Sequence, residues 1–180
     1  VGIVLGVYIG TIVLLNIPNI QQAMSVFVAE ELSEVLNTKV VIGRINMGLL
    51  NRIIIDDVLL DDQSGQEMLK VTRLSAKFDI MPFFKGKISI SSVQLFGFNI
   101  NLRKETPDSP PNFKFVLDAF ASKDTVKKEN SLDLRINSIL IRRGRMSYHV
   151  LSEEETPGKF NAKHIQLQNI IANISLKALS

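Results

Sequence analysis

The fold is decided by a short pattern that first occurs in residues 40–47, VVIGRINM, and returns in residues 53–60, IIIDDVLL. In both segments apolar residues take the first, third, sixth and eighth positions, so one extra residue separates two alternating pairs. Side chains of a strand alternate between its two faces, so the extra residue reverses the alternation unless a bulge absorbs it. With a bulge, all four apolar residues reach one face. The pattern therefore predicts bent β-strands that are apolar on one side.

The same spacing returns four more times along the chain, the last time more weakly. These matches are Leu69, Val71, Leu74 and Ala76; Ile88, Ile90, Val93 and Leu95; Leu134, Ile136, Ile139 and Ile141; and Phe160, Ala162, Ile165 and Leu167. Simpler alternating strands are expected at residues 98–102, after Gly97, and at 146–150, after Gly144. Turn-rich connections such as 61–65 and Arg143-Gly144 predict antiparallel hairpin partners. Residues 39–180 should thus be mainly β, a curved antiparallel meander forming a half-open, taco-like hydrophobic groove.

Two short helices are expected to interrupt these strands, at residues 80–84 and 113–121. The second has Phe113, Val116, Leu117 and Phe120 on one stripe, which predicts a lid packed on the sheet. The chain stops directly after the apolar strand 170–176, where an unpaired sheet edge would be a hazard in a finished domain. We therefore expect this sequence to be a fragment of a longer repeat.

The N-terminal residues have a different composition, because no Asp, Glu, Lys or Arg precedes Glu30. Residues 1–17 are apolar on every helical face, which favours a transmembrane anchor over a cleaved signal peptide or a buried helix. Seventeen residues span about 25 Å, slightly less than a membrane core, so the span is expected to begin upstream. The anchor residues are expected to include Val4, Leu5, Ile9, Ile12 and Leu15.

Residues 18–38 predict a second, amphipathic helix after Pro18, with Asn19 as a possible cap. One interpretation places this helix on a membrane surface, and the other places it over the end of a sheet. Its charged residues, Glu30, Glu31 and Glu34, are all acidic, which is unfavourable beside anionic headgroups. Packing over the sheet is therefore the favoured interpretation.

The supply of chemically reactive groups is small. The chain has 180 residues, no Cys, and 21 Lys and Arg against 18 Asp and Glu, so thiol chemistry is excluded and nucleic-acid binding is not favoured. His149 and His164 lie on separate predicted strands without acidic neighbours in sequence, and a catalytic pair is disfavoured. A calcium loop around Asp61 lacks the EF-hand spacing, so an acidic hairpin turn is preferred. We expect no enzyme activity, cofactor or metal.

One compact basic group, Arg142, Arg143 and Arg145, could contact phosphate headgroups or an acidic partner, but the solvated end of a hairpin is the simpler interpretation. The apolar face of the predicted sheet indicates more about the function than these charged residues do. It could be an ordinary core closed by the helix at 113–121, or an open groove for acyl chains, which we favour. The groove candidates are Val40, Ile42, Ile53, Ile55, Val58, Leu60, Val71, Leu74, Ile88, Ile90, Val93, Leu95, Ile136, Ile139, Ile141, Ile165 and Leu167.

Three segments carry a family resemblance. They are LLNIPNIQQAMSVFVAEELSEVLNTKVVIGRINMGLLNRIIIDDVLLDD (14–62), QSGQEMLKVTRLSAKFDIMPFFKGKISISSVQLFGFNINLRKE (63–105) and PNFKFVLDAF (111–120). As an ordered series they resemble the N-terminal region of the AsmA-like family, and within it TamB-type proteins, most like those of Bacteroidetes. Each motif alone is weak, because it consists mainly of spaced aliphatic residues. Beyond Lys123 the likeness is only one of generic repeated strands.

The resemblance implies a single-pass inner-membrane anchor, a periplasmic bulk and a long hydrophobic β-groove. It implies phospholipid transport between the inner and outer membranes, in outer-membrane biogenesis, as the function. It also implies a role in protein translocation and assembly, with an outer-membrane barrel partner of the TamA type that binds an absent C-terminal region. It supplies no catalytic residues. Two functions are therefore carried forward: a lipid conduit, and alternatively a scaffold that guides outer-membrane proteins by strand addition.

Overall fold

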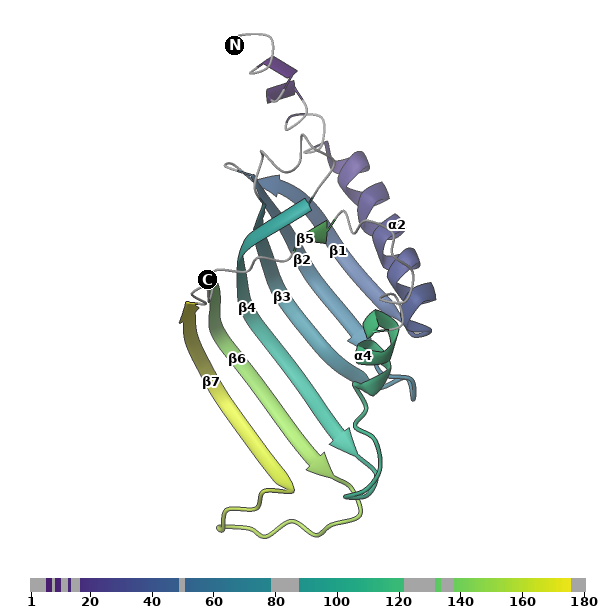
Figure 1. The fold of residues 1–180 in the computed structure, drawn as a ribbon, viewed down its shortest axis with the longest axis vertical. Coiled ribbons are helices and arrows are strands. Elements are labelled where there is room, and N and C mark those ends of the chain that lie inside the picture. The colour runs from purple at the N-terminus through teal and green to yellow at the C-terminus, as the bar shows by residue number, and fades with distance from the viewer. Residues whose placement is uncertain are drawn as a thin grey trace.

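The computed structural model describes residues 17–48, 51–78, 88–121, 132–133 and 138–175, and the single positions 6, 7, 9, 10 and 13. These residues form a mixed sheet that does not close, with six long strands in the order β1-β2-β3-β4-β6-β7 (Figure 1). The short strand β5 pairs with the beginning of β4. The strands are β1 (Val40–Gly48), β2 (Arg52–Asp61), β3 (Glu67–Phe78), β4 (Ile88–Lys104), β5 (Leu132–Asp133), β6 (Ser138–Val150) and β7 (His164–Ser175).

The extra residue of the repeat produces the expected bend. In β1 and β2, Ile42 pairs with Val58 and Ile45 pairs with Ile55, so a two-residue step separates the two apolar pairs in both strands. Asp57, in the β2 step, has a φ of 56°, and Gly97, in the β4 step, has a φ of 64°. These left-handed conformations allow the apolar side chains on both sides of a step to reach the same face.

The steps face one another across five strands. We call this line of paired residues the crease: Arg44, Asp56, Arg73, Phe96 and Arg142. Because the steps share one register, the strands bend together without losing their hydrogen-bonded pairing. Figure 1 shows the resulting curvature of the whole sheet.

The prediction of an antiparallel meander is wrong at one point, because β4 and β6 run parallel. β6 therefore begins at the end of the sheet where β4 begins, since the two strands run in the same direction. Gly97 and Gly144 do not separate two strands each, since β4 and β6 continue through them. The residue with positive φ is Gly97 itself in β4 and Arg143, before Gly144, in β6, and a single such residue bends a strand but does not reverse it.

The weakest match of the repeat is also wrong. Phe160 is 87% exposed in the loop before β7, which begins only at His164. In β4 the residues in register with the other strands are Val93, Leu95, Phe98 and Ile100. These four residues have the same spacing as the predicted match, which began at Ile88, but the observed set begins five residues later, at Val93. Leu134 and Ile136 lie outside the described residues.

The helix α2 (Pro18–Leu36) forms where it was expected and packs over β1. Pro18 is its first residue and Ile17 its N-cap, so Asn19 is not the cap; proline is well suited to the first helical position because it lacks an N–H. Asn37 ends the helix in a left-handed conformation with φ 49°. Met24, Val28 and Leu32 pack against the main buried cluster. This cluster consists of Leu36, Val40, Ile42, Ile45, Leu60 and Met68.

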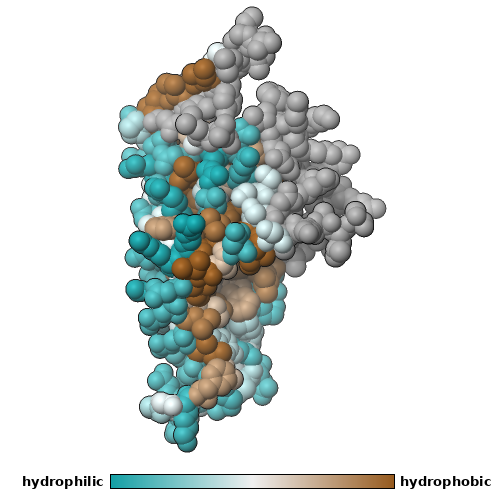
Figure 2. Space-filling view, turned by 90° about the vertical axis from the view of Figure 1, so that its left-hand side faces the viewer, coloured by the Kyte–Doolittle hydropathy of each residue, from teal (hydrophilic) through white to brown (hydrophobic). Residues whose placement is uncertain are grey.

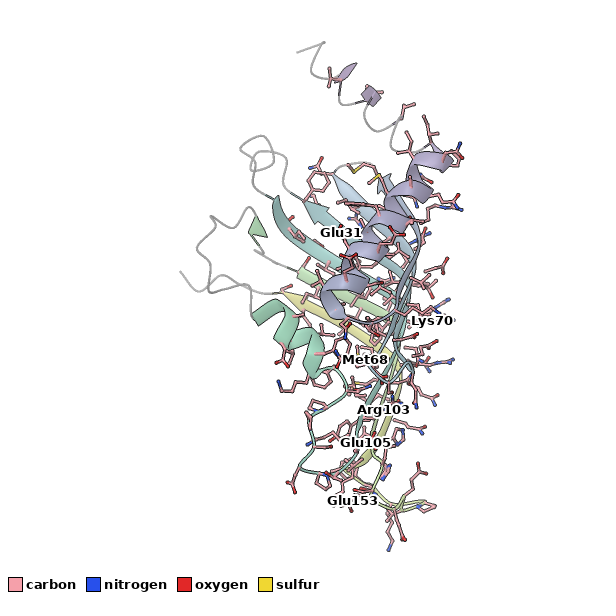
Figure 3. All side chains as sticks on the ribbon, turned by 90° about the vertical axis from the view of Figure 1, so that its right-hand side faces the viewer. Glu31, Met68, Lys70, Arg103, Glu105 and Glu153 are labelled. Atoms are coloured by element: carbon pink, nitrogen blue, oxygen red, sulfur yellow. The ribbon has the colours of Figure 1, made fainter. Side chains whose placement is uncertain are left out.

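The helix α4 (Lys114–Ala121) lies on the same side of the sheet as α2 (Figure 1). Phe115, Val116 and Ala119, together with Phe113 before the helix, pack against the buried cluster. The predicted lid therefore exists, but its stripe is different, since Leu117 is 59% exposed. Figure 3 shows Met68 on the side of the sheet with the helices, and Lys70 on the opposite side.

Two predicted elements fall mainly on residues that the structure does not describe. The short helix at 80–84 lies there entirely, as do the anchor residues Val4, Leu5, Ile12 and Leu15. Ile9 is helical and 51% exposed. Within the described ranges, no helix combines the length and the apolar character needed to cross a membrane.

Candidate functional site

The helix-bearing side of the sheet carries apolar side chains in rows that cross the strands. Three rows reach all six long strands, and each is named after its first residue. The Val40 row is Val40, Leu60, Leu69, Ile100, Met146 and Leu167; the Ile45 row is Ile45, Ile55, Leu74, Leu95, Ile141 and Ala172; the Met47 row is Met47, Ile53, Ala76, Val93, Ile139 and Ile174. Because paired residues of neighbouring strands share a face, each row forms a continuous apolar strip.

A further row, the Ile42 row, runs between the first two and is completed by an aromatic ring. It comprises Ile42, Val58, Val71 and Phe98, and then Gly144 with its partner Ile170. A Cβ placed on Gly144 would lie 2.3 Å from the Phe98 ring, so the ring occupies the space that a side chain on Gly144 would need. None of the four rows contains a charged residue.

In the Val40 and Met47 rows the exposed fraction is largest at β7, whereas in the Ile42 row Val71 and Phe98 are still buried in β3 and β4, at 2% and 6% exposed. In the Val40 row, Val40 and Leu60 are each 8% exposed beneath the helices, whereas Leu167 is 46% exposed. In the Met47 row, Ile174 on β7 is 42% exposed. Figure 2 shows the resulting apolar surface along the β7 side of the molecule. The face is therefore a core near α2 and accessible apolar surface near β7.

The groove candidates divide accordingly. Val40, Ile42, Leu60 and Val71 are buried, and Leu167 is exposed. Ile88 lies at the beginning of β4, and Ile136 is outside the described residues. The partly exposed candidates are Ile53, Ile55, Val58, Leu74, Ile90, Val93, Leu95, Ile139, Ile141 and Ile165, of which Ile53 and Ile55 pack against the buried cluster.

Several row members were not among the predicted groove candidates, although Phe98, Ile100 and Met146 lie in segments predicted as alternating strands. The clearest are Phe98, Ile100, Met146 and Ile174. Phe98 and Ile100 could have been found, since they continue the repeat spacing from Val93 and Leu95. Met146 and Ile174 could not, because their places depend on the parallel pairing of β4 with β6 and on bulges between β6 and β7.

The opposite side of the sheet is charged along the crease. Asp56 accepts a hydrogen bond from Arg73 at 2.6 Å, and this contact raises the pKa of the Arg73 guanidinium. The Arg143 guanidinium lies 5.2 Å from the centre of the Phe96 ring, a cation–π distance. Arg142, Arg143 and Arg145 lie in the middle of β6, so the interpretation that they form the solvated end of a hairpin is wrong. The two faces of the sheet thus differ sharply in polarity.

Comparisons with known proteins identify no relative of this chain, since no protein-family model, curated protein or solved structure matches it. Support for a function therefore comes from the described residues and from the family resemblance of the sequence.

The buried carboxylate of Asp62 stabilises the hairpin turn between β2 and β3. Asp62, 2% exposed, accepts hydrogen bonds from the backbone N–H groups of Ser64 and Gln66, which forms the predicted hairpin turn between β2 and β3. Arg103 donates to it at 2.5 Å and Asn112 at 3.1 Å. Burial acts to raise the pKa of Asp62, but the hydrogen bonds outweigh it and the pKa is lowered. This contact positions the segment that leads into α4.

Proposed function

We propose that the accessible parts of the four apolar rows bind acyl chains, and that the protein moves phospholipids between the inner and outer membranes. In this proposal residues 1–17 anchor the chain in the inner membrane and the sheet stands in the periplasm. The observation that supports the proposal is the absence of any charged side chain from rows that cross six strands. An acyl chain could advance along such rows without contacting a buried charge.

The expected energies are consistent with transient binding. Burial contributes about 0.8 kcal/mol for each CH₂ group removed from water, so a partly covered chain of about ten such groups gains on the order of 8 kcal/mol. The six strands span about 24 Å from β1 to β7. Movement along a uniform apolar surface exchanges equivalent contacts, so no single step has to break them all.

The second candidate function is a scaffold for outer-membrane protein assembly, acting with a barrel partner of the TamA type. The observation that favours it is the position of β7 at the end of the strand order. A strand at the end of a sheet has backbone groups that can pair with another chain. In that case the partner would contact both faces of β7 at its outer edge.

Three exposed residues of β7 distinguish the two functions. Leu167 and Ile174 belong to apolar rows, while Ile171 is 75% exposed and points to the opposite face, between the paired residues Ile170 and Ala172. A photoactivatable phenylalanine analogue is placed at each position in turn in cells, and the adducts are identified by mass spectrometry. Since all three side chains are already exposed, the replacements should disturb folding little.

The lipid proposal predicts phospholipid adducts at positions 167 and 174, with at least tenfold fewer at the matched position 171. Polypeptide adducts at all three positions, without phospholipid, would support the scaffold instead. Equal phospholipid labelling at 171 and 174 would indicate non-specific contact with a membrane and would contradict a groove.

A further inference from the structure

The fold brings the only two histidines of the chain into direct contact. His149, near the end of β6, pairs with His164, the first residue of β7. Their Nδ1 atoms lie 3.1 Å apart, with side-chain exposures of 25% and 10%. The sequence predicts the two histidines on separate strands, as found, but their contact could not be predicted because it depends on the register between β6 and β7.

A carboxylate from the connecting loop completes the cluster. Glu155 Oε1 lies 3.8 Å from Nδ1 of His149 and 3.9 Å from Nδ1 of His164. The three groups line a pocket of about 400 Å³ between β6, β7 and loop 151–163. The loop is held by its own hydrogen bonds, including one from Asn161 Nδ2 to the Glu154 carbonyl at 3.1 Å. The cluster therefore does not depend on a ligand to bring its members together.

One histidine is already oriented as a metal ligand. The distance of 2.9 Å between His164 Nε2 and the Glu153 carbonyl requires that Nε2 carries the proton and donates it. Nδ1 of His164 is then the unprotonated nitrogen, and its lone pair points toward His149. A backbone carbonyl that fixes the tautomer in this way is a regular companion of metal-bound histidine.

We propose that His149 Nδ1, His164 Nδ1 and the Glu155 carboxylate bind a divalent transition-metal ion. Zinc–nitrogen bonds of about 2.0–2.1 Å in a tetrahedral site place two ligand nitrogens about 3.3 Å apart, close to the 3.1 Å observed. Glu155 is 69% exposed and needs to move by less than about 1 Å to reach the same ion. Water would fill the remaining position. Two imidazoles favour zinc, copper or nickel over calcium or magnesium.

Such an ion would join the end of β6, the start of β7 and the loop between them through a single centre. Binding to the folded state alone stabilises it in proportion to the logarithm of ligand concentration. We therefore expect zinc to secure this end of the sheet, independently of whether the apolar face binds lipid.

Isothermal titration of the 180-residue chain with ZnCl₂ tests the proposal. We expect one ion per chain for the unmodified protein and no measurable binding for His164→Ala. Glu155→Gln should lower the affinity at least about tenfold. The matched control Glu154→Gln alters the neighbouring carboxylate outside the cluster and should change the affinity by no more than about twofold. CaCl₂ should give no binding.

A measurement on the unmodified chain guards against loss of folding in the variants. In ¹⁵N NMR spectra, zinc should shift Nδ1 of both histidines. Nε2 of each histidine should carry the proton in the zinc-bound form, so the proton that His149 Nδ1 donates to His164 Nδ1 without the ion moves to His149 Nε2. The proposal is overturned if ZnCl₂ does not bind the unmodified chain, if zinc binding persists in His164→Ala, or if the spectra show Nε2 as the zinc-bound nitrogen.

Discussion

Three segments that are distant in sequence meet at the Asp62 carboxylate. The β2–β3 turn donates backbone N–H groups to it, β4 supplies Arg103, and the segment before α4 supplies Asn112. A buried charge with this many partners is a point where one substitution has a large effect, because each partner left behind loses its counterpart.

Asp62→Asn should lower the free energy of unfolding by about 2–3 kcal/mol at neutral pH, since Arg103 loses its charged acceptor. The substitution should also change how the free energy of unfolding depends on pH. The folded pKa of Asp62 lies below its ordinary value of 3.8, so this group stabilises the fold fully above that value and its contribution disappears as the pH falls through the folded pKa. Urea unfolding between pH 7 and pH 2 measures both effects.

The neighbouring substitution Asp61→Asn is the control, and it should retain the acid-dependent loss of stability of the unmodified chain. If Asp62→Asn shows the same dependence on pH as the unmodified chain, Asp62 does not carry this contribution.

The elements show which features depend on local sequence and which do not. The two-residue step predicted the bent strands and the shared apolar face, because both depend only on the spacing within a strand. The pairing of β4 with β6 depends on the path of residues 105–137, which periodicity does not describe. Gly97 and Gly144 were interpreted as strand boundaries, yet glycine also permits a bend and a close approach within one strand.

The cluster of His149, His164 and Glu155 could not be predicted for the same reason, because it depends on strand pairing and not on local sequence. His149 and His164 become neighbours only through the register of β6 against β7, and that register contains two irregularities. The signal that sequence reasoning could have used was the 151–163 loop, which contains Glu153, Glu154 and Glu155 between the two histidines.

Gly144→Ala tests the contact between β4 and β6. The added methyl group would overlap the Phe98 ring, so we expect the free energy of unfolding to fall by about 1–3 kcal/mol. Combining it with Phe98→Leu, which removes the ring, should restore part of that loss, as a double-mutant cycle would show. Strictly additive effects of the two substitutions would contradict a direct contact.

For the whole molecule, the decisive property is that the apolar rows are uninterrupted. Val93→Asp places a charge in the middle of the Met47 row, and Ile90→Asp places one three residues earlier in the same strand, opposite Phe78 of β3. If the face binds phospholipid, the amount that co-purifies should fall at least tenfold for Val93→Asp, and both variants should fail to complement a strain lacking the protein. Mass spectrometry of extracted lipid and growth under envelope stress measure these outcomes.

Val41→Asp is the matched control, because Val41 lies between the inward residues Val40 and Ile42 and is 39% exposed. It should bind lipid as the unmodified chain does. Thermal unfolding of all the variants separates loss of binding from loss of folding. Normal complementation by both Val93→Asp and Ile90→Asp would exclude a lipid route along this face.

The crease has a mechanical consequence for the molecule as a whole. The crease runs across the strands, parallel to the apolar rows. Each strand bends where it crosses this line, so the sheet is folded along the direction of the rows. A plate that is folded along its length is stiffer against bending than a flat plate of the same thickness. We therefore expect the residues that place the apolar side chains on one face also to stiffen the sheet along the direction of the apolar rows.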